Sequence, residues 1–109
     1  MSYLTEDTFP MDIQKNYKKP FAQFVKKQRK PFQAAIEDEV LLISNNPELG
    51  ELKIGDLSGI RVRKFQFNRQ EYLIAYSHHA ETIEILFIDF YKIGTHENFY
   101  TDLKKYLKT

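Results

Sequence analysis

The sequence contains no cysteine. This absence excludes disulfide bonds and zinc sites built on cysteine thiolates, and it fits a reducing compartment. No apolar run approaches the roughly 18 residues that a membrane span needs. The first residues, Met1 to Asp7, also lack the basic-then-apolar order of a secretory signal. We therefore expect a cytoplasmic protein that has no membrane partner.

The chain also has little net charge, because its 16 basic and 15 acidic residues leave a formal charge of +1. That balance alone gives no argument for nucleic-acid binding. The charges are nevertheless segregated: residues 15–30 carry seven bases and no acid, and residues 31–51 carry five acids and no base. Such blocks can form a basic face on a near-neutral protein, and the alternative is that they are solvated helix faces.

The length and patterning indicate one packed domain. With 109 residues, of which 42% are hydrophobic, the chain is long enough to bury a core. Residues 1–10 are polar and acidic, so we expect an N-terminal extension followed by a single domain over residues 11–109. The alternation of Met11, Ile13 and Tyr17 is typical of an edge strand.

Helical spacing follows each of two prolines, Pro20 and Pro31, which are favourable in a first helical turn. We predict a helical hairpin made of one helix after Pro20 and a second over residues 32–44. A loop over residues 48–59 leads into three strands, and a helix that begins at Thr95 ends the domain. The predicted strands cover residues 60–67, 71–77 and 82–91.

The predicted fold class is α+β. We expect a small antiparallel sheet packed against the helical hairpin and the C-terminal helix, in the order β-α-α-β-β-β-α.

Two arginines in the first of the three strands could bind phosphate. Arg61 and Arg63 share a face of that strand, and guanidinium groups pair with phosphate oxygens through two hydrogen bonds. The alternative for each is an ion pair with a carboxylate of the acidic helix.

His96 and Tyr100 could exchange protons. Their spacing puts both on one face of a helix that begins at Thr95. Metal-independent RNA cleavage needs a base, an acid and cations at the phosphate, and these side chains with Arg61 and Arg63 cover those roles without a cofactor. The alternative for His96 is an ordinary surface or capping residue. His78 and His79 are expected to be exposed in a turn, where adjacent rings make a poor metal site.

The layout resembles the RelE/ParE superfamily of type II toxin–antitoxin toxins over roughly residues 11–107. The motifs that carry the resemblance are Asn46-Pro47-Glu48-Leu49-Gly50, Gly55-Asp56-Leu57-Ser58-Gly59-Ile60-Arg61-Val62-Arg63-Lys64-Phe65, Tyr72-Leu73-Ile74-Ala75-Tyr76 and Gly94-Thr95-His96-Glu97-Asn98-Phe99-Tyr100. The resemblance implies a small bacterial toxin that is neutralised by a cognate antitoxin.

Many RelE-like members cut mRNA in the ribosomal A site. By position, Arg61, Arg63 and Lys64 match the family's basic strand, while His96 and Tyr100 match its C-terminal catalytic positions. Leu73 is a departure, because RelE has a catalytic arginine there. The residues predicted to be catalytic are His96, Tyr100, Arg61 and Arg63. Those predicted to bind RNA are Lys26, Lys27, Lys53, Lys64 and Arg69.

The leading hypothesis is a ribosome-dependent mRNA endonuclease whose partners are an antitoxin, the ribosome and mRNA. One alternative is a ParE-like toxin that binds DNA gyrase and performs no chemistry. Another is a degenerate, non-toxic member that still binds antitoxin.

Overall fold

The computed structural model describes residues 12–108, so the extension predicted over residues 1–10 lies outside the described part. No helix in the described part is long and apolar enough to cross a membrane. In chain order the elements are β1 (Asp12–Tyr17), α2 (Lys19–Lys26), α3 (Lys30–Asn45), β2 (Glu51–Leu52), a short 3-10 turn η1 (Gly55–Leu57), β3 (Arg61–Phe67), β4 (Gln70–Ala80), β5 (Ile85–Gly94) and α4 (Phe99–Leu107). The α+β prediction is confirmed, with β2 and η1 added inside the expected loop.

The five strands form one sheet in the order β1-β5-β4-β3-β2. The sheet is mixed, which corrects the prediction of an antiparallel sheet, because β1 pairs with β5 in parallel. The other neighbouring pairs are antiparallel. Alternating side chains identify a strand but carry no information about its direction, which here is set by the helices that cross back between β1 and the other strands.

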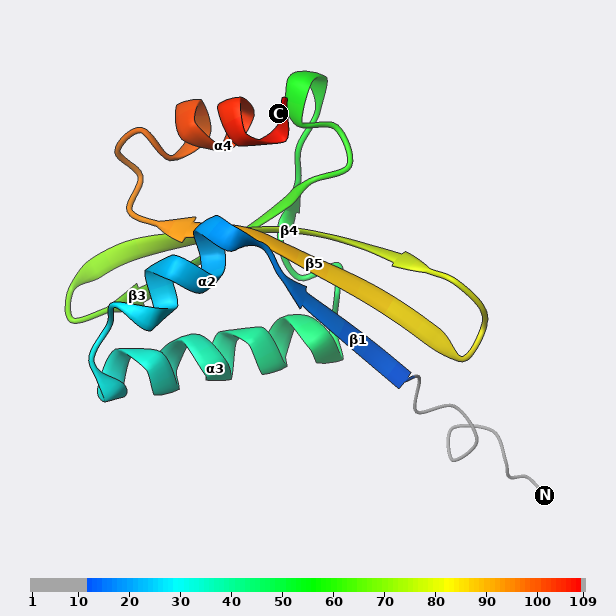
Figure 1. Cartoon of the computed structure of the whole chain (residues 1–109), viewed down its shortest axis with the longest axis horizontal. Coiled ribbons are helices and arrows are strands. Elements are labelled where there is room, and N and C mark those ends of the chain that lie inside the picture. The colour runs from blue at the N-terminus through cyan, green and yellow to red at the C-terminus, as the bar shows by residue number, and fades with distance from the viewer. Residues whose placement is uncertain (1–11, 109) are drawn as a thin grey trace.

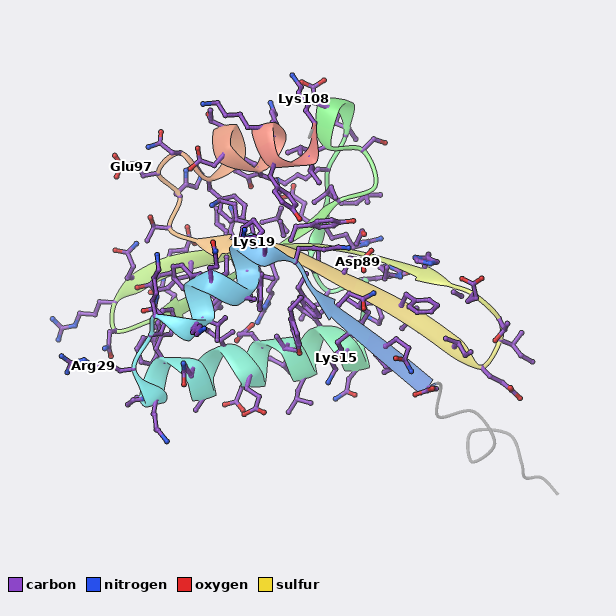
Figure 2. All side chains as sticks on the ribbon, in the orientation of Figure 1. Lys15, Lys19, Arg29, Asp89, Glu97 and Lys108 are labelled. Carbon is purple, nitrogen blue, oxygen red and sulfur yellow. The ribbon has the colours of Figure 1, made fainter. Side chains whose placement is uncertain are left out.

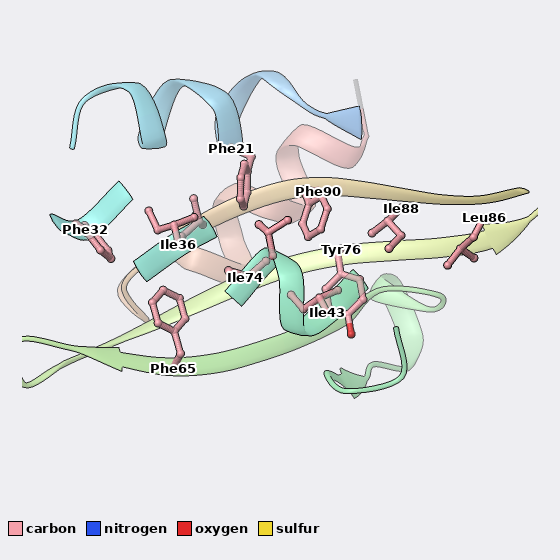
Figure 3. Close-up of a cluster of buried hydrophobic side chains, with 12 residues drawn as sticks. Phe21, Phe32, Ile36, Ile43, Phe65, Ile74, Tyr76, Leu86, Ile88 and Phe90 are labelled. Carbon is pink, nitrogen blue, oxygen red and sulfur yellow. The ribbon is translucent and has the colours of Figure 1, made fainter. Parts of the chain in front are cut away.

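Each face of the sheet is covered by different helices (Figure 1). On one face, α2 and α3 bury Phe21, Ile36 and Ile43 against Tyr76 and Phe90, as Figure 3 shows. On the other face, α4 and η1 enclose a second cluster, which consists of Leu57, Ile60, Val62, Leu73, Ala75, Phe99 and Leu103. Because side chains alternate along a strand, the odd and even positions of β3 serve different cores.

The last helix begins later than the sequence predicts. The sequence pattern makes Thr95 its cap, but α4 starts at Phe99 and is preceded by Asn98, whose φ of 59° is left-handed. Asparagine tolerates this conformation better than most residues. The backbone N–H of Phe99 donates to the carbonyl of His96 at 3.2 Å, which closes a turn in place of the expected first helical turn.

The connections between the long strands are short. Asn68 and Arg69, with φ values of 51° and 67°, form the turn between β3 and β4. Left-handed values at both positions suit a two-residue hairpin of type I′.

The prediction that His78 and His79 lie in a turn is wrong, because β4 continues through both of them to Ala80. His78 is half-buried, and His79 is exposed as expected.

Candidate functional site

His96 and Tyr100 lie together although the helix does not contain both. Their ring centroids are 5.8 Å apart, with the rings nearly perpendicular. His96 is exposed in the turn before α4, and Tyr100 is half-buried in the first turn of that helix. Tyr100 also contacts the buried ring of Phe99 edge-on. The second core therefore holds the Tyr100 ring in place while His96 faces solvent.

A lysine that follows β2, at one edge of the sheet, lies beside the pair of His96 and Tyr100. Lys53 follows β2, and its Nζ lies 5.4 Å from the centroid of the Tyr100 ring. The same nitrogen lies 3.0 Å from Oε1 of Glu51. We call Glu51, Lys53, His96 and Tyr100 the Tyr100 cluster. It joins the end of β2 to a segment far along the chain, which consists of the turn before α4 and the first turn of α4.

Electrostatics within the Tyr100 cluster keep its ion pair charged. The hydrogen bond from Lys53 and the charge of Lys53 lower the pKa of the Glu51 carboxyl, and the charge of Lys64 lowers it further. The hydrogen bond to Glu51 also raises the pKa of Lys53, and an interaction with Tyr100 adds to this. Two cations, Lys53 and Lys64, therefore act on one exposed carboxylate, and Lys53 also lies beside the tyrosine.

The Tyr100 cluster offers acid–base and cationic groups. It holds an imidazole, a phenol, a primary amine and a carboxylate, of which the first two can exchange protons with a bound substrate. The amine can stabilise negative charge on a phosphate. Residues 12–108 hold no group of three or more histidine, aspartate or glutamate side chains placed to bind a metal ion.

Arg61 and Arg63 do not join the Tyr100 cluster. Val62, between them in sequence, is buried in the α4 core, so the two arginines point to the opposite face of the sheet. There Arg63 forms an ion pair with Glu39 of α3 at 2.9 Å. That pairing is the alternative the sequence had left open for the arginines. The structure thus separates two of the predicted catalytic residues from the other two.

The remaining predicted RNA contacts are spread around the sheet. Lys64 is exposed on the α4 face, whereas Lys26 and Lys27 lie at the C-terminus of α2 under the opposite face. Arg69 occupies the β3–β4 turn. Arg29, close to Lys27 in the chain, and Glu97, next to His96, lie on opposite sides of the sheet (Figure 2). Of the five predicted RNA contacts, Lys53 belongs to the Tyr100 cluster and Lys64 lies near its Glu51, whereas the other three lie elsewhere.

Leu73, where the resemblance implies an arginine in active nucleases, is completely buried in the α4 core. This position packs against Phe99 and Leu103 in the same cluster and has no route to solvent. The cations that face the Tyr100 cluster therefore come from outside β4.

A set of hydrogen bonds from Tyr76 and Arg61, which we call the clamp, explains the motif that runs from Asn46 to Gly50. The hydroxyl of Tyr76 donates to the carbonyl of Pro47 at 2.6 Å and accepts from the backbone N–H of Gly50 at 2.8 Å. Arg61 donates to the carbonyls of Glu48 and Gly50 at 3.2 and 2.8 Å. The clamp fixes the chain between α3 and β2, and β2 in turn leads into Lys53. Sequence patterning assigned none of these contacts, because they join residues as far as 29 positions apart, such as Pro47 and Tyr76.

We expect His78 to make the fold sensitive to acid. Burial lowers the pKa of His78 from its usual 6.5, and the nearby charge of Arg61 lowers it further, while Glu48 opposes the shift. Below the unfolded pKa the unfolded chain binds more protons at this position, so stability falls as the pH drops. Urea unfolding at about pH 7.5 and about pH 5.5 measures how much the free energy of unfolding falls on acidification. We expect this fall to be smaller in His78→Gln than in wild type. Equal losses in the two proteins would contradict the assignment.

Comparison with known proteins agrees with the fold. No curated protein matches the chain. A chain of the crystal structure of the intact E. coli RelBE toxin–antitoxin complex superposes with a TM-score of 0.56 and 12% identity, covering 77% of this chain and 96% of that one. At that identity the likeness shows the fold. The family model of ParE-like toxins of type II bacterial toxin–antitoxin systems matches residues 16–104. The chain therefore belongs to the ParE-like toxin family, within the RelE/ParE superfamily.

Proposed function

We propose that this toxin is an endoribonuclease that cuts mRNA on the translating ribosome. The observation that carries the proposal is the Tyr100 cluster, in which two groups able to exchange protons lie 5.8 Å apart beside Lys53. A ParE-like toxin that acts only by binding would need no such grouping on an exposed surface.

Each member of the Tyr100 cluster has a role in the proposed reaction. His96 and Tyr100 supply the base that takes the proton of the 2′-hydroxyl and the acid that protonates the leaving 5′-oxygen. Lys53, held by Glu51, and the nearby Lys64 stabilise the negative charge that develops on the phosphate. The 2′-oxygen attacks phosphorus, and the bond to the 5′-oxygen breaks, which leaves a cyclic phosphate. The ribosome holds the mRNA in a reactive geometry, so modest acid–base groups suffice.

We also propose a cognate antitoxin as the physiological partner. The E. coli relative of similar fold was crystallised as a toxin–antitoxin complex, and the family model describes a toxin of such a system. Both observations support a protein partner, and neither identifies its amino-acid sequence.

The test is to add the purified protein to a cell-free translation reaction and to map mRNA ends by primer extension. We expect new ends within codons in the ribosomal A site, and none when translation is blocked before initiation. His96→Ala should abolish these cuts, since it removes one proton-transfer group. Intact mRNA in the wild-type reaction would contradict the proposal.

The second candidate is inhibition of DNA gyrase, which is favoured by the match to the ParE-like family model. A supercoiling assay run with the same protein preparation distinguishes the two. Blocked supercoiling with intact mRNA would assign the gyrase function and make His96 and Tyr100 packing residues. Absence of both effects would assign a non-toxic member.

A further inference from the structure

The place of Lys53 over Tyr100 depends on a short edge strand. β2 has only two residues, Glu51 and Leu52, and both are exposed. They pair with β3, and directly after them the backbone N–H of Lys53 donates to the carbonyl of Ile60 at 2.8 Å. Since a two-residue exposed strand buries little apolar surface, its own pairing is a weak anchor. Another part of the fold has to hold it.

The clamp holds the chain directly before β2. Arg61 on β3 and Tyr76 on β4 are cross-strand partners, so their side chains lie on one face of the sheet. Arg61 donates to the carbonyls of Glu48 and Gly50. The hydroxyl of Tyr76 donates to Pro47 and accepts from Gly50. Because Tyr76 is completely buried and Arg61 is half-buried, core packing fixes the two side chains that meet at Gly50.

The path from the clamp to the Tyr100 cluster is short. Lys53 follows Gly50 by three residues, which is about 10 Å of extended chain. A shift of the backbone at Gly50 therefore moves both members of the ion pair between Lys53 and Glu51, which lie 3.0 Å apart. It also moves Lys53 relative to the Tyr100 ring, whose centroid is 5.4 Å away. A misplacement of about 1 Å in an active site can slow a reaction about 100-fold.

We propose that Arg61 and Tyr76 are positioning residues, which set the place of Lys53 over Tyr100 through the chain that leads into β2. Tyr76 belongs to the core under α2 and α3, whereas Tyr100 packs against the core under α4. Both positioning residues thus act from the opposite face of the sheet, and neither contacts the reacting phosphate. The effect on cleavage rests on the proposed function, but the effect on Lys53 does not.

Two arginines of β3 supply the matched variants. Arg61→Met removes both bonds to the chain before β2, while Arg63→Met removes the ion pair with Glu39 and leaves the clamp intact. In the cell-free cleavage assay we expect Arg61→Met to be slower than wild type by about 10- to 100-fold, and Arg63→Met to stay within about twofold. Arg61→Lys keeps a donor and should recover part of the rate.

The pKa of Lys53 reports its position without any RNA. The hydrogen bond to Glu51 raises the pKa of Lys53, and NMR titration of the labelled side-chain amine measures it. Arg61→Met should lower this pKa toward its ordinary value, and Arg63→Met should leave it unchanged. Loss of the Arg61 charge by itself acts the other way, because removing a nearby cation raises the pKa of an amine. A lowered pKa in the folded variant therefore reports displacement of Lys53.

A double variant completes the test. Arg61→Met should cause no further slowing when Lys53→Ala is already present, because its effect passes through Lys53. Additive slowing, or an unchanged pKa of Lys53 in Arg61→Met, would overturn the proposal.

Tyr76→Phe keeps the proposal testable if Arg61→Met does not fold. It removes only the hydroxyl that bonds Pro47 and Gly50, and it should lower the pKa of Lys53 in the same way. An unchanged pKa of Lys53 in folded Tyr76→Phe would also overturn the proposal. If wild type cuts no RNA while the pKa of Lys53 responds as expected, the nuclease is refuted and the positioning role of the clamp stands.

Discussion

Replacement of Tyr100 by phenylalanine is expected to slow mRNA cleavage about 100-fold, the lower end of what a single acid–base group contributes. The change removes only the hydroxyl. The ring keeps its contacts with His96 and Phe99, and Lys53 still lies over it. The loss should therefore fall on the chemical step, with cleavage measured from the accumulation of primer-extension ends over time in cell-free translation.

Two controls define the result. Tyr106→Phe makes the same chemical change on the same helix, outside the Tyr100 cluster, and should leave the rate unchanged. Arg63→Ala tests a residue that the sequence placed in the site and the structure places on the other face, paired with Glu39. We expect Arg63→Ala to retain cleavage and to lose stability. Full activity of Tyr100→Phe, or inactivity of a folded Arg63→Ala, would contradict the assigned site.

Replacement of Gly50 by alanine is expected to destabilise the fold by about 1–3 kcal/mol, the usual cost of overpacking a tight site. A Cβ at this position would lie 2.9 Å from Cε1 of Tyr76, 3.0 Å from its hydroxyl oxygen and 3.0 Å from the carbonyl carbon of Val62. Tyr76 is completely buried, and its ring belongs to the core cluster drawn in Figure 3. The nearest atom of Val62 belongs to the backbone, so neither neighbour can move aside without a cost. Urea unfolding followed by circular dichroism measures the loss.

The matched control is Gly94→Ala. A Cβ there would meet its nearest heavy atom, Cδ1 of Phe99, at 3.9 Å, an ordinary contact distance. Tyr76→Phe tests the other half of the clamp, because it leaves the buried N–H of Gly50 without its partner at a cost of about 1–3 kcal/mol. Unchanged stability in both Gly50→Ala and Tyr76→Phe would mean that the clamp does not hold the chain before β2.

Much of the fold could be predicted from local pattern. The prolines at 20 and 31 and the spacing of apolar residues predict α2 and α3, and strand alternation predicts β3 to β5 near their observed bounds. These signals are local, since they depend on residues within a turn or two of each other. The direction of β1 and the pairing of β2 were missed because the sequence within a strand does not specify its neighbour.

The candidate site was predicted only in part, for a related reason. We expected His96 and Tyr100 to lie together on a helix that begins at Thr95, four residues before the observed start of α4. The two rings do lie together, because the turn before α4 brings His96 to Tyr100. Lys53 was predicted to bind RNA, but its place over Tyr100 depends on β2 joining the edge of the sheet. Arg61 was assigned to phosphate, although it binds the backbone of the chain before β2.

The sequence by itself determined the α+β class, the family resemblance and the chemical types available for a site. Only the tertiary structure decided which of those side chains meet. Alternation along β3 puts Arg61 and Arg63 on one face and Val62 on the other, but which face the Tyr100 cluster occupies depends on where α4 packs. That choice is made by burial of Phe99 and Leu103 against the even positions of β3 and the odd positions of β4, contacts between residues distant in the chain.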